Sequence, residues 1–131
     1  MLQGIHPLLT GALLARLDAM GHSDTLVVAD ANFPAQRTDP HALEIPGARA
    51  AEVVAAIRTV MPLDDPAAVV LMECPDGLQE VQRELVEAAG APADFLDRFA
   101  FYQAAATSRL VIRTGETRPW GNALLTKGVV S

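Results

Sequence analysis

Two side chains that can exchange protons flank a short apolar run in the first third of the chain. His22 precedes the run over residues 25–29, and Asp30 follows it. An imidazole can give or take a proton near neutral pH, and a carboxylate can act as a base or accept hydrogen bonds from hydroxyl groups. If the run is a β-strand, its rise of about 3.3 Å per residue places the two groups at opposite ends of a rod. They can therefore share a site only where two chain segments or two subunits meet.

Each of these residues also has a simpler interpretation. A helix is expected to end at Met20 and to be closed by Gly21 in the left-handed conformation. His22 could then serve only as a cap of that helix, whose dipole favours a protonated ring. Asp30 could be a turn residue that bonds to its own backbone. Asp30 could instead belong to a binding site, because it follows the carboxyl end of a predicted strand, where ligands bind in open α/β sheets.

Arg98 and the segment Trp120-Gly121-Asn122 could contact a ligand. Arg98 stands among aromatic residues, and its planar guanidinium can hold paired oxygen atoms; the alternative is a surface ion pair with Asp94 or Asp97. The only tryptophan of the chain offers a face that suits the apolar side of a sugar, and an asparagine can donate and accept toward hydroxyl groups. The alternative for this segment is a turn packed by the indole. Tyr102, at helical spacing from two phenylalanines, is predicted to lie in the core.

Apolar spacing and chain-breaking residues predict the elements that position these side chains. Helices are expected over residues 10–20, 48–61, 76–90 and 95–106, and strands over 25–29, 69–72, 110–113 and 122–127. Asp76 is the expected N-cap of the third helix, with Gln79 completing a capping box. Prolines should keep residues 30–47 irregular. This order predicts a single three-layer α/β/α domain over residues 1–131, with a mostly parallel sheet covered on both faces.

Composition excludes several classes of protein. Half of the 131 residues are hydrophobic and the net charge is −6, with ten scattered basic residues, which argues against disorder and against a nucleic-acid or anionic-membrane partner. A single cysteine, Cys74, cannot form an internal disulfide and favours a reducing compartment. We find no signal peptide and no apolar stretch near the roughly 20 residues that span a membrane, so a cytoplasmic protein is expected.

Metal and cofactor chemistry has little support in the sequence. His22 with Asp24 or Asp30 could hold a metal ion, but a third nearby histidine is missing. No glycine-rich dinucleotide motif follows a strand and no phosphate loop is present. Cys74 has no adjacent histidine and is predicted to be a small buried apolar residue. We therefore expect no cofactor and no bound metal.

The residues singled out above carry a family resemblance. Five segments carry it in order: Met20-Gly-His-Ser-Asp24, Asp30-Ala-Asn-Phe-Pro34, Arg98-Phe-Ala-Phe-Tyr102, Thr114-Gly-Glu116 and Trp120-Gly-Asn122. They resemble the D-ribose pyranase / L-fucose mutarotase family, and the third and fourth segments are closer to its fucose branch. The similarity runs from about Leu2 to Val129, nearly the whole chain.

The resemblance implies a cofactor-free isomerase that interconverts the anomers of a monosaccharide, L-fucose or D-ribose. It also implies a ring-shaped homo-oligomer, decameric in many members, with sites at subunit contacts. His22 would be the proton donor, and Asp30, Arg98 and the segment Trp120-Gly121-Asn122 would bind the sugar. We hypothesise in addition that Asp30 orients a hydroxyl group or assists as base. The family usually has tyrosine where this chain has Trp120, whose N–H only donates and cannot relay a proton.

Three alternatives differ in the chemistry that they predict. A non-catalytic sugar-binding or regulatory protein would bind fucose or ribose and leave anomer exchange unchanged. A ribose-type pyranase would interconvert pyranose and furanose forms. A metal-dependent hydrolase would lose its activity with a chelator.

Overall fold

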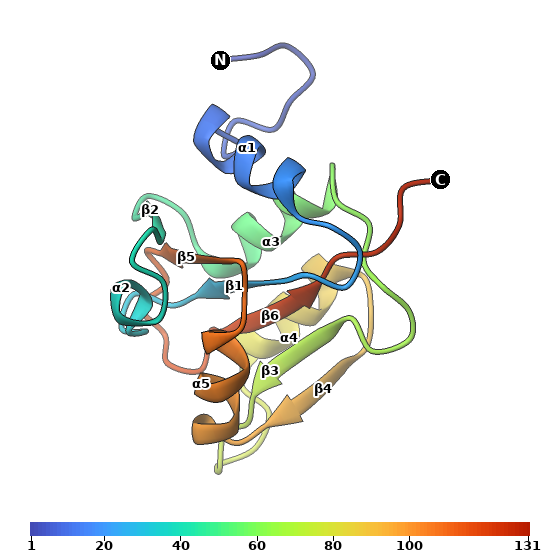
Figure 1. Ribbon diagram of the computed structural model, residues 1–131. Coiled ribbons are helices and arrows are strands. Elements are labelled where there is room, and N and C mark those ends of the chain that lie inside the picture. Colours follow the sequence, from blue (N-terminus) through green and yellow to red (C-terminus); the bar gives the residue numbers. More distant parts are fainter.

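A six-stranded β-sheet forms the centre of the computed structural model, which describes residues 1–131 (Figure 1). The strands are β1 (Thr25–Ala29), β2 (Leu43–Ile45), β3 (Val69–Met72), β4 (Ala93–Leu96), β5 (Leu110–Thr114) and β6 (Ala123–Thr126). The helices are α1 (Gly11–Ala19), α2 (Ala35–Thr38), α3 (Ala50–Arg58), α4 (Glu80–Ala89) and α5 (Arg98–Ala106). None of these helices has the length and apolar character needed to cross a bilayer.

Five of the six strands run in the same direction. The sheet has the order β2-β5-β1-β6-β3-β4, and only β6 is antiparallel to its neighbours, β1 and β3. The predicted mostly parallel sheet is therefore confirmed. The arrows of β1, β3 and β4 in Figure 1 point toward one edge, where β6 begins. This carboxyl edge is the place where ligands bind in open α/β sheets.

Successive residues of β1 point into two separate apolar cores. Leu26 and Val28 lie in the larger core together with Leu13 of α1, Ile57 of α3 and Leu85 of α4, all fully buried. Each such side chain contributes roughly 1.5–3 kcal/mol by its burial. Because side chains alternate across a strand, the residues between them face the opposite side of the sheet.

The smaller core covers that opposite side. Val27 and Ala29 of β1 pack there with Phe33 and with Phe101 of α5. Figure 1 shows α5 in front of the sheet and α3 and α4 behind it. The sheet is thus covered on both faces, as the three-layer prediction required.

Helix α4 begins later than predicted. Its N-cap is Gln79, whose backbone N–H donates to the side chain of Gln82 at 3.0 Å, so the capping box is formed by these two residues and the prediction for Asp76 is wrong. Residues before Gln79 form a turn in which Gly77 has φ of 96°. The buried Gln82 fixes the start of the helix, because its Nε2 also donates to the carbonyl of Met72 at 2.7 Å. The helix ends at Gly90, as predicted, and Gly90 has the left-handed conformation.

The predicted helix over residues 95–106 is two elements. Residues 93–96 form β4, which pairs with β3, and Phe95 lies on this strand. Helix α5 starts after Asp97, whose side chain accepts a hydrogen bond of 2.9 Å from the backbone N–H of Ala100. Residues 30–47 also differ from the prediction, because they contain the short elements α2 and β2. The other predicted helices and strands are present, with ends shifted by a few residues.

Candidate functional site

A cavity of about 240 Å³ lies at the carboxyl edge of the sheet. Its lining includes Asp30, Arg98, Tyr102, Trp120 and Asn122, which come from the end of β1, from helix α5 and from the segment just before β6. Four of the six predicted site residues therefore line one pocket, and a fifth, Gly121, lies between two of them. The cavity is smaller than the ~300–1,000 Å³ of pockets for drug-sized molecules, which favours a small ligand.

Asp30 and Asn122 form a reciprocal pair at the bottom of this pocket. The backbone N–H of Asp30 donates to Asn122 Oδ1 at 2.8 Å, and Asn122 Nδ2 donates to Asp30 Oδ2 at 3.0 Å. The second carboxylate oxygen of Asp30 accepts from the backbone N–H of Asn32 at 3.0 Å. Asp30 and Asn122 are 5% and 3% exposed. Burial raises the pKa of Asp30 above its ordinary value, although the hydrogen bonds from Asn32 and Asn122 act in the opposite direction.

The Thr114-Gly115-Glu116 segment ties the end of β5 to the end of β1. The hydroxyl of Thr114 donates to the carbonyl of Ala29 at 2.8 Å and accepts from the backbone N–H of Glu116 at 3.2 Å. The carbonyl of Glu116 accepts from the backbone N–H of Ala31 at 2.8 Å. A Cβ atom on Gly115 would lie 2.0 Å from the carbonyl oxygen of Pro46, so only glycine fits. These contacts hold Asp30 in place from both sides.

Helix α5 presents Arg98 and Tyr102 to the pocket one turn apart. The guanidinium of Arg98 lies 4.9 Å from the ring centre of Phe99 and forms no ion pair. The alternative pairing with Asp94 or Asp97 is therefore absent, and the paired N–H groups are available to a ligand.

Tyr102 lies in the pocket wall, whereas the sequence predicted a core position. It is half-buried, and its ring packs edge-to-face against Phe33 at 5.6 Å between centroids. Phe33 in turn packs against Phe101 at 6.1 Å. The missed signal was the spacing of four residues between Tyr102 and Arg98, which puts both on one face of a helix.

Trp120 has an uncommon backbone conformation at the rim of the pocket. Its φ is 70°, in the left-handed region that few residues other than glycine adopt. The half-buried indole packs against the smaller core. Gly121 follows where space is limited, because a Cβ atom there would lie 3.0 Å from Glu116 Cγ and 3.1 Å from Val81 Cγ2. The backbone of this segment is thus closely fitted to the residues beneath it.

His22 lies at the other end of β1, as the sequence predicted. Its side chain is 57% exposed, and Nε2 lies 3.3 Å from Asp64 Oδ1. Because Nε2 of His22 is directed at Asp64, Nδ1 is the ring nitrogen that can bind another group. Asp64 was not among the predicted site residues, because it is 42 residues from His22 and only the fold brings them together.

The interpretation of His22 as a helix cap does not agree with the structure. Lys127 Nζ donates to the carbonyls of Leu17, at 3.1 Å, and of Met20, so an ammonium group satisfies the end of α1. Gly21 does not adopt the left-handed conformation that was predicted; Ser23 does, with φ of 68°. The backbone N–H of Ser23 donates to the carbonyl of Lys127 at 2.9 Å, which explains why the turn closes two residues later.

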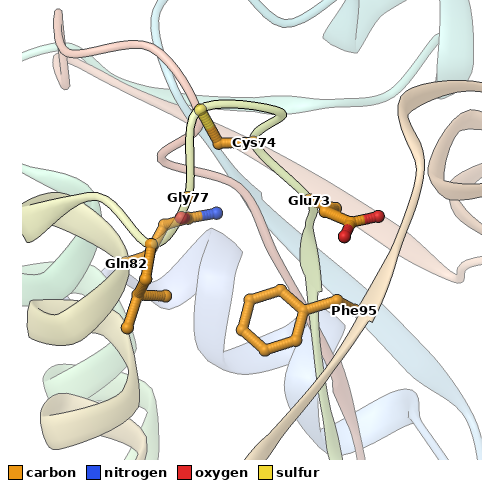
Figure 2. A pocket seen from close by; sticks show the side chains of 6 residues that line it. Glu73, Cys74, Gly77, Gln82 and Phe95 are labelled. Atoms are coloured by element: carbon orange, nitrogen blue, oxygen red, sulfur yellow. The ribbon is translucent and has the colours of Figure 1, made fainter.

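A second hollow, of about 260 Å³, lies beyond the end of β3. Figure 2 shows Gln82 reaching it from helix α4 and Phe95 from strand β4, with Glu73 and Cys74 nearby. Both ends of the Gln82 amide are already used, toward Met72 and Gln79. Cys74 is 6% exposed, in agreement with the predicted buried position. This hollow lacks the buried carboxylate–amide pair of the first pocket.

The pocket joins a buried carboxylate–amide pair to an arginine and two amphipathic aromatic side chains, a set that suits a small polyhydroxylated ligand. Residues 3–130 match the RbsD / FucU transport protein family, and the chain belongs to that family. The predicted resemblance to ribose pyranases and fucose mutarotases is thereby confirmed.

Individual relatives cover nearly the whole chain. A fucose mutarotase of Danio rerio is 37% identical over 99% of this chain and 95% of its own. The crystal structure of the fucose mutarotase from Streptococcus pneumoniae in complex with L-fucose has a TM-score of 0.88 and 29% identity, covering 99% of this chain and all of the other. Bacillus subtilis RbsD complexed with D-ribose has a TM-score of 0.78 and 27% identity, covering 96% of this chain and 98% of the other.

Proposed function

We propose that this protein is a monosaccharide mutarotase that interconverts the α and β anomers of L-fucose, with the pocket around Asp30 as its sugar site. The observation that carries this proposal is the buried Asp30–Asn122 pair, set in a small pocket beside Arg98, Tyr102 and Trp120. A fucose mutarotase among the relatives supports the choice of sugar.

The proposed reaction needs only two proton transfers. Asp30 takes the proton of the anomeric hydroxyl, while a protonated imidazole gives one to the ring oxygen. The bond between the anomeric carbon and the ring oxygen breaks, and an open-chain aldehyde forms. Rotation and reclosure on the other face, with both proton transfers reversed, give the other anomer. The raised pKa of Asp30 makes its carboxylate a stronger base, and each positioned acid or base contributes typically 10²–10⁴-fold.

The remaining side chains bind and orient the sugar in this proposal. Arg98 donates paired N–H groups to neighbouring hydroxyl oxygens. Tyr102 offers a phenol that can donate or accept, and the face of Trp120 packs on the apolar side of the ring. The Nδ2 group of Asn122 keeps the Asp30 carboxylate facing the pocket.

His22 enters the site from a neighbouring copy of the chain in this proposal. Within one chain it lies at the opposite end of β1 from the pocket. Large apolar side chains are exposed in two regions: Phe99 next to Arg98 of the pocket, and Val60 and Val130 in a hollow whose lining includes Pro62, two residues before the His22 partner Asp64. A contact between two unlike ends of the chain repeats head to tail from one subunit to the next. The subunits close into a ring when the rotation between neighbours allows it. We propose a homo-oligomeric ring, with ten subunits as the resemblance implies, in which each contact completes one site.

Exchange NMR on equilibrated L-fucose tests the activity. Wild-type protein should accelerate exchange between the α and β signals, and Asp30→Asn and His22→Ala should each reduce the acceleration by at least about 10²-fold. Asp76→Asn, a change of an exposed aspartate outside the pocket, should exchange like wild type. Binding of L-fucose without faster exchange would identify a non-catalytic sugar-binding protein instead.

The same experiment with D-ribose tests the second candidate substrate. A ribose-type pyranase would accelerate exchange between pyranose and furanose signals of D-ribose and leave L-fucose unchanged. We expect the larger acceleration with L-fucose.

A further inference from the structure

The segment between Glu116 and Asn122 forms one wall of the pocket and contains no helix or strand. Its two ends are fixed, by the hydrogen bond from Ala31 to the Glu116 carbonyl and by the Asp30–Asn122 pair. Between these ends the backbone forms only the turn at residues 119–120, and the backbone N–H of Gly121 faces the Asp30 carboxylate. The left-handed conformation of Trp120 is strained for a residue with a side chain and persists only where the surroundings impose it. Side-chain contacts supply further support in the middle of the segment.

Arg118 supplies that support through a double clamp. Its Nη1 and Nη2 donate to the two carboxylate oxygens of Glu84 on α4, at 2.7 and 2.9 Å. Its Nε and Nη2 donate to the two carboxylate oxygens of Glu116, at 2.9 and 3.0 Å. The guanidinium thus fixes the segment to helix α4 with four charge-assisted hydrogen bonds. The same bonds hold the pKa values of Glu84 and Glu116 below their ordinary range.

Glu116 passes this restraint on to the pocket. Its side chain is 3% exposed, and its Cγ lies where a side chain on Gly121 would otherwise be. Gly121 is bonded to both Trp120 and Asn122, which line the pocket. Without the Arg118 guanidinium the Glu116 carboxylate would be buried with no cation beside it, which favours its movement toward water or its uptake of a proton. Either change would shift the Glu116 side chain that fills the space next to Gly121.

We propose that Arg118 is a positioning residue: clamped between Glu84 and Glu116, it fixes the Trp120–Asn122 wall and so sets the affinity of the pocket for its sugar. The inference about affinity rests on the proposed function, whereas the inference about the wall does not. Lysine cannot replace Arg118, because a single ammonium group does not match two carboxylates in the way a planar fork does.

Trp120 makes the proposal directly measurable, because it is the only tryptophan of the chain. Arg118→Lys should increase acrylamide quenching of Trp120 fluorescence in the sugar-free protein by about twofold or more and lower its anisotropy. Glu84→Gln should do the same to a smaller degree. Because Glu84 lies at the surface of α4, this second variant keeps the test available if Arg118→Lys does not fold. Arg113→Lys is the matched control, since it disturbs an ion pair of similar exposure, with Glu44, outside the pocket.

Kinetics test the second half of the proposal. Arg118→Lys should raise KM for L-fucose about tenfold and leave kcat within about twofold, because the clamp orients the binding wall and no proton donor or acceptor is lost. Unchanged Trp120 quenching in both clamp variants would overturn the proposal, whether or not the protein has mutarotase activity. A changed fluorescence with an unchanged KM would overturn the role in affinity. Absence of activity in wild type together with altered Trp120 quenching would contradict the proposed function and leave the clamp supported.

Discussion

Substituting Asn122 with aspartate would turn the buried carboxylate–amide pair into two carboxyl groups. Asn122 Nδ2 lies 3.0 Å from Asp30 Oδ2. Two ionised oxygens at that separation would repel by about 5.5 kcal/mol at an effective dielectric constant of about 20. Keeping one carboxyl protonated at pH 7 costs about 4 kcal/mol for an ordinary aspartate. Because the second cost is smaller, the pair should bind one proton in the folded protein, and that proton restores the hydrogen bond.

The sign of the pH dependence follows from this proton. A carboxyl whose folded pKa is raised keeps its stabilising effect below the unfolded pKa and loses it as the pH rises through the folded pKa. In wild type, stability is lost as the pH rises through the raised pKa of Asp30. In Asn122→Asp the loss should extend to higher pH, at about 1.4 kcal/mol per pH unit. Relative to wild type, the free energy of unfolding should fall by about 1.5 kcal/mol at pH 5 and about 4 kcal/mol at pH 7.

Urea denaturation at several pH values between 5 and 8 measures this difference. Gln103→Glu, which adds one negative charge on the exposed side of α5, is the control and should follow the wild-type curve. A loss of stability in Asn122→Asp that does not change with pH would refute the reasoning, because it would mean that the two carboxyl groups share no proton.

Three further predictions concern the elements that support the site. Gly115→Ala should lower the free energy of unfolding by about 3 kcal/mol or more, because the added Cβ would lie 2.0 Å from a backbone oxygen. Gly47→Ala is the control in the same denaturation assay, and it should be nearly neutral because the space around Gly47 is open. Lys127→Met should lower the free energy of unfolding by about 1.5–3 kcal/mol, because the hydrogen bonds of Lys127 to the end of α1 are lost. Arg83→Met, at an exposed position, is the control and should leave stability unchanged. Equal stability of the two variants in denaturation would contradict the capping role of Lys127. Because the pKa of Asp30 is raised, kcat/KM for anomer exchange should decline with falling pH before the pH reaches 3.8, the ordinary pKa of aspartate. A pH–rate profile that stays flat down to pH 3.8 would contradict Asp30 as the base.

Local patterns predicted those parts of the fold where a short segment contains all the information. The apolar run of β1 and the glycine that ends α4 are examples. Phe95 shows the limit, because its spacing from Phe99 and Tyr102 imitates a helix. Pairing of β4 with β3, about 24 residues earlier in the chain, places Phe95 on a strand, and the cap at Asp97 starts the helix only afterwards. Such pairing is a tertiary contact that single-sequence spacing does not contain.

The candidate site was predictable to a similar extent. Asp30 and Asn122 each stand beside the end or start of a predicted strand, so the topology of a mostly parallel sheet brings them to one edge. Arg98 reaches the same edge because helix α5 starts just after β4, a strand that was not predicted. Contacts between side chains far apart in the sequence could not be predicted. Arg118 and Glu84 are 34 residues apart, and nothing in the residues around either one indicates the other.

Mixing two inactive variants tests most directly whether each site combines His22 of one subunit with Asp30 of the next. His22→Ala and Asp30→Asn would be combined in equal amounts by coexpression, and anomer exchange of L-fucose measured by NMR. In a closed head-to-tail ring about one quarter of the contacts should then contain both intact residues, so about one quarter of wild-type activity should return. Asp30→Asn mixed with Asn122→Ala is the control, since both defects lie on the same side of a contact and no activity should return. If His22→Ala with Asp30→Asn stays as inactive as each variant separately, the shared site is contradicted.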